Sequence, residues 1–253
     1  DIVITGGTFS LITGDDGIHA DGDMSISDGN ILIHDSYEGI EAATMTLSGG
    51  IINLAARDDG INVAGGNDTG QGGFGYDRFA SGDQWLHITN GDITVDAQGD
   101  GIDVNGDMEM SGGTVLINGP TNNGNGALDF DGTFNLTGGT LMAAGSYGMA
   151  QTPSNSSSQM SLMLVYTSGQ EAGTTVVLAE NDVEKLSFTP TKPFQMILIS
   201  SSDMQEGAAY AVKTGGNTVN ITLTDLVTAV SETGEAVPQR GGGMGGQRPG
   251  GRR

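Results

Sequence analysis

The chain contains no cysteine, which excludes disulfide bonds and thiolate metal sites. It has no apolar run of about 18 residues, which excludes a membrane-spanning helix. Only nine of the 253 residues are lysine or arginine, and four of these nine lie in the Gly-rich stretch 240–253. The rest of the chain carries 31 acidic side chains against five basic ones, which disfavours binding to nucleic acid or to anionic lipid unless a cation intervenes. A divalent cation is therefore the first partner that the composition predicts.

Glycine is the most informative residue that is present. The 44 glycines disfavour long helices, and the chain is long enough to bury a sizeable core, so a turn-rich all-β protein is expected. The sequence starts at Asp1 rather than at methionine, and we expect that a leader or an upstream cap preceded it.

An acidic turn that leads into a short alternating strand recurs along the first half of the chain. Glycine-containing turn pairs recur at spacings of 21, 22 or 26 residues, with one double-length spacing, and alternating apolar residues flank each pair. A unit repeated in this way predicts a repeated structure. The copies of the acidic turn are Gly14–Ile18, Tyr37–Ile40, Asp58–Ile61, Gly99–Ile102 and Asn125–Leu128.

This periodicity predicts a right-handed parallel β-helix of about six coils of about 22 residues each, over residues 1–150. An antiparallel sandwich is the alternative, but its strands would not share one template. The double-length spacing holds an insertion at about 64–84. Residues 151–237 are expected to form a smaller antiparallel β region that caps the rod, and 238–253 a disordered tail. The strands expected in the cap are Leu162–Thr167, Thr174–Ala179, Phe194–Ser200, Tyr210–Lys213 and Val219–Leu223.

Acidic residues on both sides of the recurring Gly-Ile step should stack from coil to coil. At a coil spacing of about 4.8 Å, two carboxylates repel by roughly 0.9 kcal/mol in water and roughly 3.5 kcal/mol at an effective dielectric constant of 20. Calcium, which prefers oxygen ligands, would remove this cost; the alternative is that the acids are solvated turn residues. The predicted calcium ligands are Asp15, Asp16, Glu38, Glu41, Asp58, Asp59, Asn62, Asp100 and Asp103.

Catalysis on polysaccharides is a competing interpretation. A β-eliminating lyase needs calcium and a basic residue that removes a proton. Because Lys185, Lys192 and Lys213 fall in the capping region, Arg57 is the candidate base. A hydrolase would need paired carboxylates, and adjacent acids on a turn point apart, so hydrolysis is the least favoured chemistry.

The three histidines give no support to a catalytic site. His19, His34 and His87 have no recognisable partner motif around them in the sequence. We interpret each of them as an outward-facing strand residue.

The combined motifs resemble a known family. These motifs are the Asp-Asp-Gly-Ile repeat (as at Asp58–Ile61), the Gly-Asp-Met runs Gly22–Gly29 and Gly106–Gly113, and Ala64–Asp68. Together they resemble a bacterial family of carbohydrate-binding β-helix proteins, similar in fold to family 9 pectate lyases. The resemblance implies calcium ions on the acidic turns, and binding of polysaccharide without cleavage.

We therefore expect a secreted or cell-surface, monomeric, calcium-loaded module that binds plant cell-wall polysaccharide, either pectic or cellulose. Tyr37, Tyr76 and Trp85 are candidate sugar-stacking residues, although simple packing is the alternative for each. The alternatives for function are a calcium-dependent pectate lyase with Arg57 as base, and a calcium-stiffened adhesion scaffold.

Overall fold

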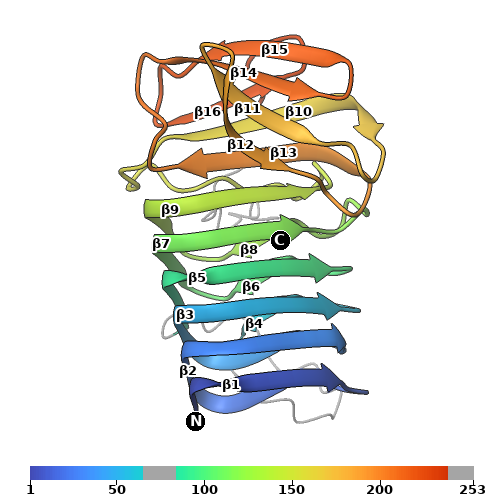
Figure 1. Ribbon diagram of the computed structural model, residues 1–253, viewed down its shortest axis with the longest axis vertical. Helices are drawn as coiled ribbons and strands as arrows, with labels where there is room; N and C mark the ends of the chain where they lie inside the picture. The colour runs from blue at the N-terminus through green and yellow to red at the C-terminus, as the bar shows by residue number, and fades with distance from the viewer. Residues whose placement is uncertain (65–83, 239–253) are drawn as a thin grey trace, which may run out of the picture.

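The computed structural model describes residues 1–64 and 84–238, and in these ranges it contains sixteen β-strands and no helix. Figure 1 shows a rod of stacked strands with the N-terminus at its foot and the C-terminal strands on top. None of the described segments is a helix that is long and apolar enough to cross a membrane. The predicted tail lies almost entirely outside the described residues.

Six long strands stack in parallel along one side of the rod, and each pairs with the next (Figure 1). A second side is formed by the beginnings of the second and third strands together with three short strands, which also pair in parallel. The result is a β-solenoid of about five turns, so the predicted parallel β-helix is confirmed. The long strands are β1 (Ile2–Ile12), β2 (Ile18–Asp35), β3 (Ile40–Ala56), β5 (Trp85–Ala97), β7 (Asp107–Asn118) and β9 (Phe134–Gly145), and the short ones are β4 (Ile61–Val63), β6 (Ile102–Val104) and β8 (Leu128–Phe130).

Inward-facing apolar side chains stack in columns inside the rod. One column runs through Met24, Met45, Leu86, Met108 and Phe134, which are paired in register from strand to strand. All five side chains are buried. Strict alternation places every second residue inside, so one repeated sequence pattern builds one continuous core.

Glycine is required where adjacent coils approach most closely. A Cβ atom on Gly39, in the acidic turn, would collide with the carbonyl oxygen of Gly60 in the next coil and lie 2.8 Å from Leu54 Cδ1. At the turn pairs the second glycine has a positive φ, for example Gly50 with φ of 88° and Gly113 with φ of 81°. The repeated glycines therefore allow adjacent coils to approach closely at two corners of the rod.

The C-terminal region continues the sheet of the rod and adds a second sheet. β13 (Phe194–Ser201) pairs antiparallel with β9, and β10 (Ser161–Gln170) joins β13 to β16 (Val227–Ser231). All five strands expected in this region are present, whereas β12 and β16 were not predicted. The second sheet contains, in order, β12 (Val183–Phe188), β11 (Val176–Glu180), β14 (Ala209–Thr214) and β15 (Asn217–Thr222).

Substituting Gly39→Ala should lower the free energy of unfolding by about 1–3 kcal/mol, because the added methyl group overlaps the backbone of the next coil. Gly14→Ala is the matched control, since nothing lies within 4 Å of the position that its methyl group would take. Urea denaturation followed by circular dichroism measures both. Equal stability of the two variants would contradict the assigned role of Gly39.

Candidate cation site

The residues that follow the recurring Gly-Ile step form one column on the second side of the rod. His19, Glu41, Asn62, Asp103 and Asp129 are paired in register from one coil to the next. Glu41 and Asn62 are only 5% and 6% exposed, so this column lies largely below the surface. The stacking that the repeat predicted is confirmed.

The acids that precede the recurring glycine bind the backbone of the next coil. Asp16 Oδ1 accepts a hydrogen bond from the amide of Glu38 at 3.3 Å, and Asp59 Oδ1 accepts one from Asp100 at 2.6 Å. Asp100 Oδ1 accepts one from the amide of Gly126 at 2.5 Å. Each of these bonds engages one oxygen of the carboxylate with the neighbouring coil.

Histidine neutralises the acids of the first coil. His19 Nδ1 lies 3.2 Å from Asp16 Oδ2 and also contacts Glu41 Oε2, and its Nε2 lies 3.1 Å from Asp21 Oδ1. The hydrogen bond to Asp21, together with Glu41 and Asp16, raises the pKa of His19 to about 9 against the opposing effect of burial. The expectation that His19 has no partner is therefore wrong; its partners come from the same coil and the next one.

Side-chain amides donate hydrogen bonds to the acids at two further positions. Asn62 Nδ2 donates to Glu38 Oε2 at 2.7 Å, and Gln151 Nε2 donates to Asp129 Oδ1 at 3.0 Å. Burial still raises the pKa of Glu38 to about 8, against the effect of the bond from Asn62. Gln151, which follows the last coil, was not predicted as a site residue.

Asp59, Asp100 and Asp103 form a cluster without such a donor. One carboxylate oxygen from each lies within 4.8 Å of the others. Among the described residues, none donates a hydrogen bond to the Asp103 carboxylate. Burial, followed by neighbouring carboxylates, raises the pKa of Asp103 to about 8. Burial also raises the pKa of Asp59 to about 6 and that of Asp100 to about 7, despite the backbone bonds that these two accept.

Two further observations test whether a cation fits this cluster. Gly99 provides no side chain where Asp58 and Asp59 converge: a Cβ there would lie 2.5 Å from Asp58 Oδ1 and would also collide with Asp59 Oδ1. Asn62 Oδ1 is buried and has no hydrogen-bond partner among the described residues. Since the other arm of this amide is bonded to Glu38, the free oxygen is directed away from that residue. Carboxylate oxygens that converge on one glycine and an unpartnered amide oxygen both suit a bound cation nearby.

The donors in this cluster are all oxygen atoms. The three carboxylates match the ligands that Ca²⁺ takes from proteins, and their negative charge favours a divalent ion; Asn62, which is paired in register with Asp103, offers an amide oxygen as a further ligand. A calcium ion held here would supply positive charge that could attract an acidic ligand. The chain's own contribution is to hold these oxygens at one step of the rod.

Among the other predicted carboxylate ligands, Glu38 and Asp58 belong to neither of the two clusters. Asp16 and Glu41 lie with His19 rather than with the all-oxygen cluster. Asp15 is exposed, and its backbone oxygen accepts bonds from the Tyr37 amide and the Thr13 hydroxyl. The carboxylate of Asp15 belongs to neither cluster.

The candidate sugar-stacking residues occupy different surroundings. Tyr37 is 46% exposed, and a hydrogen bond to Asp58 raises its pKa to about 12, so its ring stands beside the acidic column. Trp85 is half-buried at the start of β5, with its ring centroid 4.3 Å from that of His87. Tyr76 lies outside the described residues.

Arg57, the candidate lyase base, is held by the backbone of the two preceding coils. Its Nε donates to the carbonyl oxygen of Ser36 at 3.0 Å, and one of its terminal nitrogens donates to Gly14 at 3.0 Å. Nε also lies 3.4 Å from Asp35 Oδ1. Arg57 therefore has a structural role, because its side chain ties its own coil to the two preceding coils.

Lys192 was assigned to the cap by the sequence, but its side chain reaches back to the rod. Its ammonium group donates to the carbonyl oxygen of Ala97 and lies 2.9 Å from Asp96 Oδ1. The hydroxyl of the adjacent Thr191 donates to the same carboxylate at 2.7 Å. The capping region is therefore tied to the outer face of β5.

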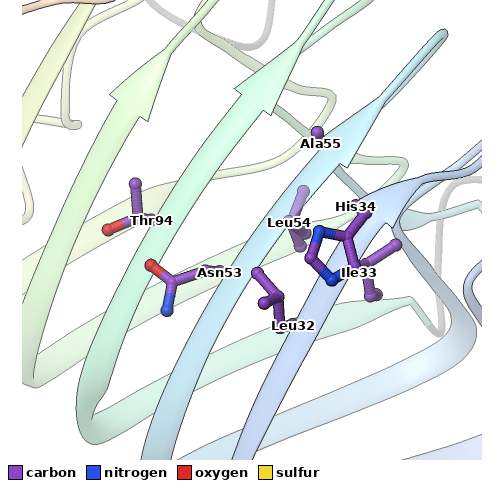
Figure 2. A pocket seen from close by; sticks show the side chains of 7 residues that line it. All are labelled: Leu32, Ile33, His34, Asn53, Leu54, Ala55 and Thr94. Atoms are coloured by element: carbon purple, nitrogen blue, oxygen red, sulfur yellow. The ribbon is translucent and has the colours of Figure 1, made fainter. Parts of the chain in front are cut away.

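A shallow pocket of about 260 Å³ lies on the outer face of the long strands. Figure 2 shows Leu32, Asn53 and Thr94 on the neighbouring strands β2, β3 and β5, where they are paired in register. His34 stands at its edge and contacts the Ser10 hydroxyl at 3.0 Å. The pocket residues include no acidic side chain and no nucleophile with an adjacent base.

In a comparison with known proteins, no family model, curated protein or solved structure matches the chain. The resemblance to carbohydrate-binding β-helix proteins therefore stays a prediction.

The metal-free protein should lose stability as the pH rises from about 4 to about 8. The unfolded chain releases its carboxyl protons near pH 4, whereas the folded chain retains those of Asp59, Asp100 and Asp103 up to about pH 6–8. Their contribution is thus complete below pH 4 and is lost above pH 8. Urea midpoints in chelator measure this trend, and Asp103→Asn should flatten it. A midpoint that rises with pH over this window would contradict it.

Proposed function

We propose that the protein is a non-catalytic, calcium-dependent module that binds acidic plant cell-wall polysaccharide outside the cell. The observation that carries the proposal is the cluster of Asp59, Asp100 and Asp103, three half-buried carboxylates with no side-chain donor among the described residues. A bound divalent cation removes the repulsion between these groups.

The charge of the chain supports a cation-bridged acidic ligand. A formal net charge of −22 would repel a polyuronate such as polygalacturonate in the absence of metal. Calcium can accept oxygens from the protein and from a uronate at the same time, since it takes six to eight ligands. The exposed ring of Tyr37, bonded to Asp58 beside the cluster, offers a flat apolar face for a sugar ring.

The placement of Arg57 and Lys192, two basic residues that the structure describes, favours binding over cleavage. Arg57 is held by backbone carbonyl oxygens and by Asp35. Lys192 is bonded to Ala97 and paired with Asp96. A base that must take a proton from a substrate needs to be free of such partners.

Gly99→Ala should weaken calcium binding about tenfold or more, equal to about 1.4 kcal/mol, because the added methyl group would displace the carboxylates of Asp58 and Asp59. Isothermal titration calorimetry of the chelator-stripped protein measures the affinity. Glu109→Gln is the matched control, since this exposed carboxylate on β7 belongs to neither cluster. Equal calcium affinity of both variants and wild type would place the ion elsewhere.

Polygalacturonate should sediment the protein in the presence of calcium and release it when a chelator is added. Absorbance of unsaturated sugar ends in the same samples should stay at baseline. Rising absorbance would instead establish a lyase, and an absence of both signals would favour a calcium-stiffened scaffold. Tyr37→Ala should weaken the sedimentation without changing calcium affinity, whereas unchanged sedimentation would remove Tyr37 from the binding surface.

A further inference from the structure

The first coil carries a side-chain cluster with a donor set different from that of the calcium candidate. Asp16, His19 and Glu41 each place one ligand atom within 4.8 Å of the others. Asp16 and His19 come from one coil, and Glu41 is paired in register with His19 in the next. Glu41 is only 5% exposed, so an ion bound by its carboxylate would be largely shielded from water.

The histidine ring is oriented from its outer side. Asp21 Oδ1 lies 3.1 Å from Nε2, while Nδ1 faces Asp16 and Glu41. A carboxylate that accepts a hydrogen bond from one ring nitrogen fixes the tautomer whose lone pair is on the other nitrogen, as it does for histidine ligands of zinc. The amide nitrogens of Asn62 and Gln151, which serve the other acids of the column, have no lone pair to offer a metal.

We propose that Asp16, His19 and Glu41 form a binding site for a transition-metal dication such as Zn²⁺. One imidazole nitrogen and two carboxylates suit zinc, whereas calcium prefers a shell of oxygen atoms only. The metal replaces the proton held between His19 and Glu41. The His19 side chain is 30% exposed, so an ion can reach the ring from solvent. This site is independent of the proposed calcium site.

Calorimetric titration of the chelator-stripped full chain with zinc chloride, at constant pH and in excess calcium, tests the proposal. We expect one zinc ion per chain, with His19→Gln weakening its affinity by at least about tenfold and Asp21→Asn weakening it by about 10–100-fold. The chain contains only three histidines, so His34→Gln and His87→Gln complete the matched set and should bind zinc as wild type does.

Absence of zinc binding by the wild-type protein would overturn the proposal, as would an equal loss of affinity in His34→Gln. If His19→Gln does not fold, Asp21→Asn still decides the question, because the Asp21 carboxylate is 84% exposed; wild-type affinity in that variant would refute the site. Gly99→Ala separates the two proposals, since it should retain zinc binding while losing calcium affinity.

Discussion

In-register hydrogen bonding between parallel coils places each side chain about 4.8 Å from its counterpart in the next coil. On the inside of the rod this constraint is favourable, because the column from Met24 to Phe134 buries apolar surface at every step. On the outside it is costly wherever the repeated residue is an acid, since equal charges are held at a fixed short distance. The rod cannot relax this repulsion without breaking its own ladder.

The steps of the acidic columns differ in the side chain that donates a hydrogen bond to their carboxylates. His19 serves the acids of the first coil, Asn62 donates to Glu38, and Gln151 donates to Asp129 beyond the last turn. The step that contains Asp103 has no such donor among the described residues. A column of near-identical turns thereby acquires one all-oxygen position without a side-chain donor, where calcium is favoured, and the identity of single residues selects it. The proposed function and the proposed zinc site both follow from these local differences.

The repeat predicted the solenoid, the alternation of its strands and the stacking of its acids, because these properties are local and periodic. The roles of His19, Gly99 and Lys192 were not predicted. His19 finds Glu41 only through the coil register, and Gly99 matters only because Asp58 and Asp59 of the preceding coil converge on it. Lys192 contacts Ala97 across 95 residues of sequence separation, a contact that no repeat pattern encodes.

The most direct measurement is a crystal structure of the chelator-stripped protein soaked in calcium, with anomalous scattering used to locate the ions. We expect calcium bound by Asp59, Asp100 and Asp103, and none bound by the Glu38 carboxylate, which accepts a hydrogen bond from Asn62. Calcium bound by the Glu38 carboxylate, or no calcium at the three aspartates, would contradict the claim that the missing internal donor determines where calcium binds.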